Sequence, residues 1–210
     1  MSDDDQRWRA WKEQTFGNDY MIWHDGLYTG QVACLSGDAR DEALGMLRLG
    51  LALGDAHAAE ALAAMGDAST IGSMRAHLDE AQGAEKVRVA LAIHELGPDP
   101  ALAAHLVEVL RSPLHWTHRI DAAMGLRRFS GADDEAALLL AVEEDPEYLV
   151  RYHACESLLA RWGIQPAEVS AHPEIFERVT GPKGDAPLEP GDFANFREAR
   201  VLLERLRDGR

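Results

Sequence analysis

The sequence predicts an all-α protein, folded as a right-handed α-solenoid of about four to five stacked helix pairs. Glycines end Ala/Leu-rich stretches at four places, separated by 31, 34 and 32 residues: Gly66, Gly97, Gly131 and Gly163. Four positions share one offset of 32 residues: Arg119, Ala122, Leu126 and Gly131 correspond to Arg151, Ala154, Leu158 and Gly163. Between the glycines, apolar residues such as Ile71, Met74 and Leu78 recur at helical spacing, which is typical of amphipathic helices.

The first 36 residues differ from the rest of the chain because they are rich in aromatic side chains. Six of the fourteen aromatic residues lie here: Trp8, Trp11, Phe16, Tyr20, Trp23 and Tyr28. Solenoids need atypical ends to cover exposed core, so residues 1–36 are predicted to form an N-terminal cap. An exposed docking surface is the alternative, since Trp and Tyr are favoured interface anchors.

Residues 37–163 are predicted to form the repeats, each a helix, a turn and a second helix. The expected pairs are 39–53 with 56–65, 68–80 with 84–96, 99–111 with 115–129, and 132–144 with 147–162. The glycines are expected to end helices in the left-handed conformation. Four polar residues are expected as N-caps: Asp67, Asp99, Ser112 and Asp145.

Residues 164–210 are predicted to form a C-terminal extension. The Gly/Pro-rich stretch 180–191 is expected to be a loop. Asp192 is then expected to cap a final helix that packs on the last repeat, although a tail that docks elsewhere is an alternative. One stripe of this helix is apolar: Phe196, Ala199, Leu203 and Leu206.

The repeated unit resembles a known family. Residues 57–78, HAAEALAAMGDASTIGSMRAHL, together with the dipeptides Val87-Arg88 and Val150-Arg151, are similar to short HEAT-like repeats of the kind found in phycobilisome bilin lyases. The resemblance covers residues 39–163 and implies the solenoid fold. It also implies that Arg88, Arg119 and Arg151 are structural, each paired with an acidic residue of the array.

Two enzyme groups with HEAT-type folds do not fit. Deoxyhypusine hydroxylase needs repeated His-Glu pairs, and this chain has only His94-Glu95. Alkylated-base DNA glycosylases need a basic concave surface, which a net charge of −15 does not favour. Bilin-lyase activity is kept as an alternative.

The acidic balance bears on partners. With 36 acidic and 21 basic residues, the chain is expected to avoid nucleic acid and anionic membranes and to suit a protein with a basic surface. Plain solubility is the competing explanation. The two cysteines, Cys34 and Cys155, show no disulfide pattern, and neither a secretory signal nor a membrane span is apparent, so a cytoplasmic location is predicted.

The candidate catalytic and metal-binding motifs of this sequence are weak. His115 and His118 lie one helical turn apart, with Asp121 a turn further on, but a metal site is not the favoured interpretation. Cys155 and His153 are two residues apart and would face different directions on a helix. No catalytic residue, metal or other cofactor is therefore predicted.

The stretch from Ala132 to Val150, which we call the acidic run, contains no Lys or Arg. The helix dipole and capping explain Asp133, Asp134, Glu135, Asp145 and Glu147. Glu143 and Glu144 are left without such a reason, so the acidic run is interpreted as a patch for a basic partner.

The hypothesis from sequence is a non-catalytic protein-binding module for a cationic bacterial protein, such as an immunity protein or inhibitor. The alternatives are a bilin-lyase-like enzyme or chromophore-protein adaptor, and a general assembly scaffold. The second helices of the pairs are expected to line a concave face. The predicted partner-binding residues on those helices are His94, His118, Asp121, His153 and Glu156, and those of the acidic run are Asp133, Asp134, Glu135, Glu143 and Glu144.

Overall fold

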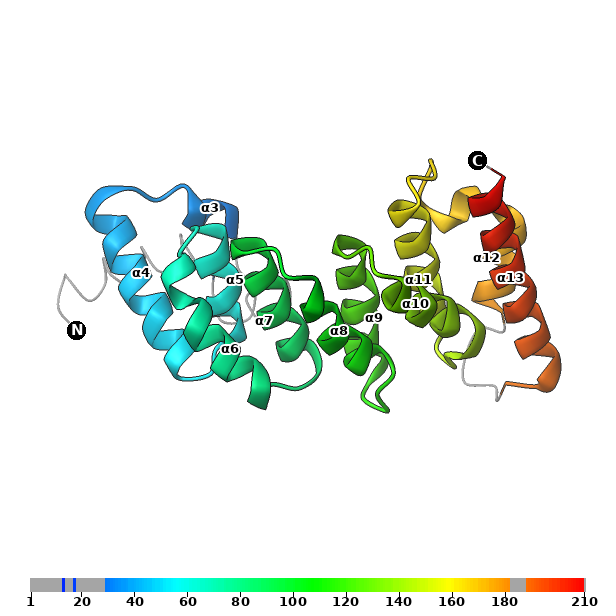
Figure 1. Ribbon diagram of the computed structural model, residues 1–210, viewed down its shortest axis with the longest axis horizontal. Helices are drawn as coiled ribbons and strands as arrows, with labels where there is room; N and C mark the ends of the chain where they lie inside the picture. The colour runs from blue at the N-terminus through cyan, green and yellow to red at the C-terminus, as the bar shows by residue number, and fades with distance from the viewer. Residues whose placement is uncertain (1–12, 14–16, 18–28, 182–187, 210) are drawn as a thin grey trace. The chain divides into compact units, whose positions relative to one another are not determined.

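The computed structural model describes Glu13, Gly17, residues 29–181 and residues 188–209 (Figure 1). Over these residues all regular structure is helical, with eleven α-helices, four short 3-10 helices and no strand. The predicted all-α class is confirmed. In the same residues, no helix has both the length and the apolarity needed to cross a bilayer. Most of the predicted cap at 1–36 lies outside the described residues.

The chain divides into two compact units. The first holds the described residues up to Ala81 together with Arg88–Asp99, and the second holds Gln82–Val87 together with the described residues from Pro100 onward. The helix α7 (Gly83–Leu96) therefore gives its first residues to the second unit and the rest to the first.

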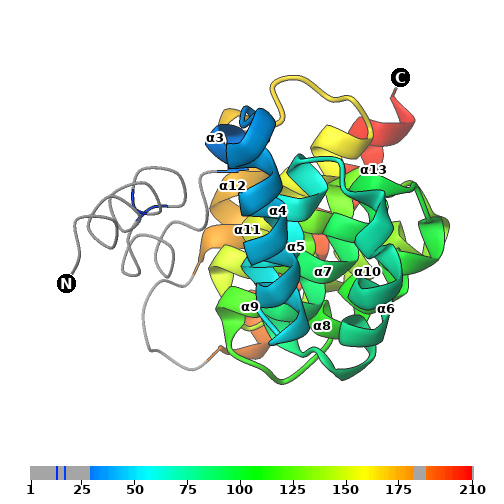
Figure 2. The ribbon, with the colours of Figure 1, turned by 90° about the vertical axis from the view of Figure 1, so that its left-hand side faces the viewer.

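The first unit is built from antiparallel neighbours in the sequence. α4 (Gly37–Ala52) packs along α5 (Ala56–Ala64), and α3 (Thr29–Ala33) also contacts α5 (Figure 2). η1 (Ala68–Thr70) leads into α6 (Ile71–Glu80), which contacts α4. The core of this unit is apolar and fully or nearly buried: Leu47, Leu51, Leu62, Met74, Leu78 and Ile93.

The second unit contains the remaining helices in chain order. They are α8 (Ala103–Leu110), α9 (Trp116–Gly125), α10 (Ala132–Glu144), α11 (Tyr148–Arg161), α12 (Pro173–Thr180) and α13 (Pro190–Asp208). Three 3-10 turns join them: η2 (Pro100–Leu102), η3 (Leu126–Arg128) and η4 (Val169–Ala171). α9 packs on α8 and α11, α10 packs on α11, and α12 packs on α11 and α13. α13 also packs on α10, so the predicted docking of the terminal helix is confirmed.

Each helix of the four predicted pairs is present, and its ends differ from the prediction by a few residues at most. The main difference is at the ends: two first helices begin as 3-10 turns, η1 and η2, and one second helix ends as η3. Gly66 and Gly163 take the expected left-handed conformation, with φ of 73° and 63°. Gly97 and Gly131 do not take this conformation. Gly131 instead precedes α10, with φ of −70°. A repeated glycine therefore serves two different turns.

Two of the four predicted N-caps, Ser112 and Asp145, are wrong, whereas Asp67 lies at the predicted N-cap position, before η1. Ser112 donates its hydroxyl to the Val109 carbonyl, and His115 occupies the N-cap position of α9. Asp145 ends α10, and the cap of α11 is Glu147, whose side chain accepts from the Leu149 N–H. Short polar residues near a helix start compete for the same role, and their order in the sequence does not decide which one wins.

The C-terminal extension differs from the prediction at three points. α12 was not predicted, although Pro173 at its start and the buried residues Ile175 and Val179 form a helical pattern. α13 begins at Pro190, and Asp192 accepts from the Glu189 N–H from within its first turn rather than from the cap position. On the predicted apolar stripe Phe196, Ala199 and Leu203 are buried, but Leu206 is 37% exposed.

Candidate functional site

The two buried carboxylates of the acidic run are used inside the second unit. Asp134 accepts from the Gly131 N–H at 2.9 Å, at the start of α10. Asp145 accepts from Arg119 through both carboxylate oxygens, at 2.8 and 3.0 Å, and also from the Glu147 N–H. Both residues are less than a tenth exposed. They therefore organise helix ends and are not presented to a partner.

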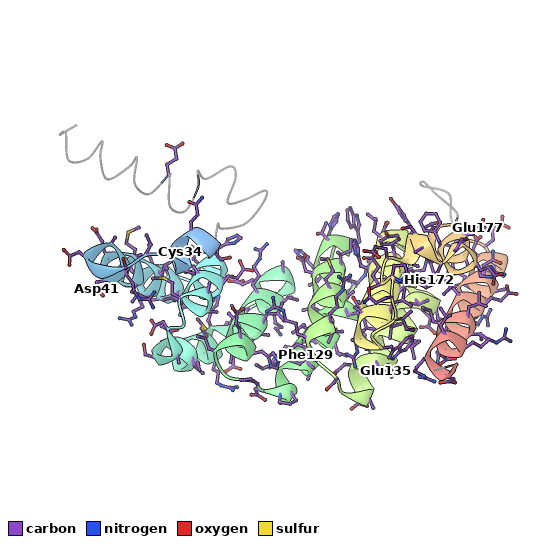
Figure 3. The ribbon with its side chains drawn as sticks, turned by 90° about the horizontal axis from the view of Figure 1, so that it is seen from above. Cys34, Asp41, Phe129, Glu135, His172 and Glu177 are labelled. Carbon is purple, nitrogen blue, oxygen red and sulfur yellow. The ribbon has the colours of Figure 1, made fainter. Side chains whose placement is uncertain are left out.

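Two further carboxylates of the acidic run pair with the terminal helix. Glu143 accepts from Arg200 at 2.7 Å. Glu135 accepts from Arg207 at 3.0 Å and from the indole N–H of Trp162 at 2.9 Å (Figure 3). Their arginine partners lie 57 and 72 residues away in the sequence. Neither capping nor the helix dipole explained Glu143 from the sequence. In the structure its carboxylate pairs with Arg200 and so helps to dock α13.

Of the predicted acidic patch, Asp133 and Glu144 are the members left exposed. Glu144 lines an open groove of about 540 Å³ between the α8–α9 turn and the end of α10. The walls are mostly apolar, from Leu110 and Pro113 on one side to Leu140 on the other. The carboxylates of the acidic run are therefore too few and too dispersed at the surface to form a strongly acidic patch.

Two of the three histidines predicted for the concave face, His94 and His118, act at helix ends. His94 accepts the Asp99 N–H at its Nδ1 atom at 3.0 Å, in the turn after α7. His118 accepts the Ala84 N–H at its Nδ1 atom at 3.2 Å, in the first turn of α7. The first N–H groups of a helix lack partners within the helix, so each imidazole replaces water or a capping side chain. A Cβ atom at Gly83 would come within 3.1 Å of the His118 ring, which explains the glycine there.

His153 and Glu156 do lie together, on α11. The Nδ1 atom of His153 is 3.5 Å from Glu156, whose carboxylate also accepts from Arg127 at 3.2 Å. Arg127 in turn donates to the Ser157 hydroxyl at 2.9 Å. Burial lowers the pKa of His153 below its ordinary value of 6.5, the nearby Glu156 carboxylate acts in the opposite direction, and Arg127 lowers it further. Burial raises the pKa of the Cys155 thiol, so that thiol stays protonated and is not a nucleophile.

A second cluster of the same composition lies in the first unit and was missed from sequence. The Nε2 atom of His57 is 3.2 Å from Arg88, and Glu60 lies 3.4 Å from the His57 Nδ1 atom and 3.6 Å from Arg88. His57 and Glu60 precede His153 and Glu156 by 96 residues, three repeats of 32. Alignment of the His-x-x-Glu spacing could have found it. Both clusters are half-buried between helices, so we assign them to helix packing.

Asp121 lies on α9 and is partly exposed. In the part of the chain that the structure describes, no three His, Cys, Asp or Glu side chains gather as metal ligands. The stripe of His115, His118 and Asp121 is therefore not such a group, since both histidines already have roles at helix starts.

The surface that the sequence did not single out is the outer face of α4. Three exposed acidic residues lie near its start, and two exposed leucines four residues apart lie at its end, the second of them at the C-cap position. We call them the α4 face: Asp38, Asp41, Glu42, Leu49 and Leu53. Leu49 and Leu53 are 62% and 79% exposed, the two highest values among large apolar side chains in the described residues. Figure 2 shows α4 in front of α5, and Figure 3 shows Asp41 pointing away from the helices.

The acidic half of the α4 face is not paired within the described residues. Asp38, Asp41 and Glu42 have no basic partner there, whereas Arg40 donates to the Met65 carbonyl and Arg48 pairs with Asp67 at 2.8 Å. The hydrogen bond from Arg48 holds the pKa of Asp67 below its usual range. The helix dipole favours acidic residues at this end of α4. It gives no reason for two exposed leucines at the other end.

Comparison with known proteins identifies no relative. No protein-family model, no curated protein sequence and no solved structure gives a significant match to this chain. The function must be argued from the chain's own surface.

Proposed function

We propose that this chain is a non-catalytic protein-binding module for a partner with a basic and partly apolar surface. The α4 face carries the proposal. It joins three exposed carboxylates to two leucines that are 62% and 79% exposed, Leu49 and Leu53. Contiguous exposed apolar side chains rimmed by charge mark sites of protein interaction. One concrete form is an immunity protein or inhibitor that covers the basic site of a toxin or enzyme.

The proposed architecture is a HEAT-like solenoid of four to five pairs. This architecture is supported by the arginine that recurs at the start of the second helices and by the contacts that each of these arginines makes. Arg119 pairs with Asp145, Arg88 lies 3.6 Å from Glu60, and Arg151 is fully buried among backbone carbonyls. Arrays of this kind bind proteins along extended surfaces.

The two halves of the α4 face would have different roles in binding a partner. Leu49 and Leu53 would supply the buried apolar contact, worth about 1.5 to 3 kcal/mol for each side chain fully covered. Asp38, Asp41 and Glu42 would steer a cationic partner and reject an anionic one. Association should therefore weaken as salt is added, because exposed charges are screened beyond about 8 Å at physiological ionic strength.

The test is affinity capture of proteins from the native cell, compared between immobilised variants. Asp41→Lys/Glu42→Lys should lose the captured partner, and Leu53→Lys should lose it as well. The matched control is Asp79→Lys/Glu80→Lys, another exposed acidic pair of the first unit, which should capture as the wild type does. Equal capture by all variants would overturn the assignment of the α4 face.

A further inference from the structure

A second exposed face, on the terminal helix, has the opposite charge. Arg197, Val201 and Arg205 lie on one stripe of α13, and Leu206 lines one cavity together with Arg205. We call these four residues the arginine face: Arg197, Val201, Arg205 and Leu206. Val201 and Leu206 are 44% and 37% exposed. Two cavities of about 390 and 330 Å³ lie along this stripe and share Leu202 and Arg205. The two cavities are thus lined by apolar side chains and by arginines, together with one glutamate in each, Glu198 and Glu174.

The free charge on this face is positive, although the chain carries a net charge of −15. Arg197 and Arg205 have no carboxylate partner among the described residues. Arg178, which also lines one cavity, is paired with Glu198 at 3.1 Å. The other two arginines of α13 are taken up by the docking contacts with Glu143 and Glu135. Arg197 and Arg205 are therefore the two arginines of α13 that have no carboxylate partner in the described residues, and they lie beside exposed apolar side chains.

The arginine face is basic and partly apolar, which are the two properties proposed for the partner of the α4 face. Among the described residues, the α4 face presents three carboxylates without a basic partner and two exposed leucines. The arginine face presents two arginines without a carboxylate partner, together with exposed Val201 and Leu206. The stripes are about 22 and 14 Å long, at 1.5 Å per residue, so they can lie along one another as packed helices. On the α4 face the carboxylates and the leucines lie at opposite ends, whereas on the arginine face Val201 lies between Arg197 and Arg205.

We propose that the basic partner of the α4 face is the arginine face of a second copy of this chain. The proposal rests on the proposed function in using the α4 face as the binding surface, and it adds the identity of the occupant. The two faces differ, so the contact is heterologous, and each bound copy still offers one free face. Association is then head to tail, and it gives rings or open chains rather than a two-fold dimer.

A contact between single helices is small, at the low end of the areas that specific interfaces bury. Association should therefore be weak, concentration-dependent and sensitive to salt. The test is sedimentation velocity on the purified full chain from about 5 to about 500 µM, a range that covers weak micromolar affinities. The average mass of the wild type should rise above the 23.1 kDa of one chain. In about 0.5 M salt it should return to that value, since the Debye length falls below 8 Å.

Variants assign the contact to the two faces. Asp41→Lys/Glu42→Lys and Arg205→Glu should each remain at one chain mass across the whole range. Matched controls are Asp79→Lys/Glu80→Lys for the first and the exposed Arg111→Glu for the second, and both should associate as the wild type does. A chain with both face substitutions, Asp41→Lys/Glu42→Lys/Arg205→Glu, reverses both signs and should recover association. A thermal melt of each variant checks that these surface changes leave the fold intact.

A wild type that stays at one chain mass to the highest concentration would overturn the proposal, as would association that the face variants and their controls share equally. Either of these sedimentation results can be distinguished from a failure of the capture experiment. The sedimentation contains no other protein, so its failure leaves a different basic partner for the α4 face in place. Loss of the α4-dependent capture would instead remove the proposed function, even where purified chains associate.

Discussion

Arg151 shows how much structure one side chain can organise. It is fully buried, and its guanidinium donates to the carbonyls of Val179 in α12, at 2.9 Å, and of Gly181 just after α12, at 3.1 Å. It also donates to the Asp145 carbonyl and lies 3.8 Å above the Phe196 ring on α13. Burial lowers the pKa of Arg151 to about 10, so the guanidinium is still charged at neutral pH. The single arginine therefore connects α11 to both helices of the C-terminal extension.

Replacing Arg151 by Met should destabilise the chain strongly. The change leaves several buried carbonyls without a donor, and losses of this type cost about 3 to 5 kcal/mol. Urea denaturation followed by circular dichroism measures the loss. Arg111→Met, at an exposed position, should change stability by no more than about 0.5 kcal/mol. Equal midpoints for the two variants would contradict the role given to Arg151.

His153 should make stability fall in mild acid. Because burial lowers its pKa in the folded chain below the ordinary 6.5, the unfolded chain binds more protons between those two values. Stability is therefore lost as pH decreases through that window, and a side chain that does not titrate avoids the loss. Between about pH 8 and about pH 5.5, the urea midpoint of the wild type should drop further than that of His153→Gln. His115→Gln, on an exposed histidine, is the control and should follow the wild type.

At the scale of the element, α13 is held by an apolar face and by two ion pairs, and these should differ in weight. Phe196, Ala199 and Leu203 are fully buried, whereas Arg200 and Arg207 are about one third exposed. Phe196→Ala should cost about 3 to 5 kcal/mol, and Arg200→Met/Arg207→Met about 2 kcal/mol or less. Hydrogen exchange of the α13 amides, compared with those of α9, measures the difference. A larger effect from the arginine pair would show that charge holds this helix.

The helices themselves could be predicted from local pattern, because apolar spacing and the repeated glycines are local. Gly66 and Gly163 even have the expected left-handed backbone. The acidic run could not be interpreted in the same way. Glu143 and Glu135 find Arg200 and Arg207 across 57 and 72 residues, and a single sequence gives no means of matching them. The exposure of Leu49 and Leu53 was hidden for a similar reason, since a leucine within a helical pattern normally faces the core.

At the scale of the whole molecule, the boundary between the two units passes through α7. Gln82–Val87 belong to the second unit, where Lys86 donates to Glu108 at 2.8 Å and Ala84 donates to His118 at 3.2 Å. A fragment of residues 82–210 should therefore be more stable than one of residues 100–210, by about 1 to 3 kcal/mol for the lost cap and buried contacts. Thermal melts of the two fragments measure this. Equal melting temperatures would show that Gln82–Val87 add nothing to the second unit.

The buried position of Arg151 has a consequence for how the chain is made. Synthesis proceeds from the N-terminus, so Arg151 is added to the chain before two of its acceptors, Val179 and Gly181. Until α12 arrives, the guanidinium has to stay in water, and the final packing of α11 has to wait. A product that stops before α12 keeps an unburied arginine on an apolar helix. Such a truncated chain should be less stable than one that includes α12, because its Arg151 lacks two acceptors.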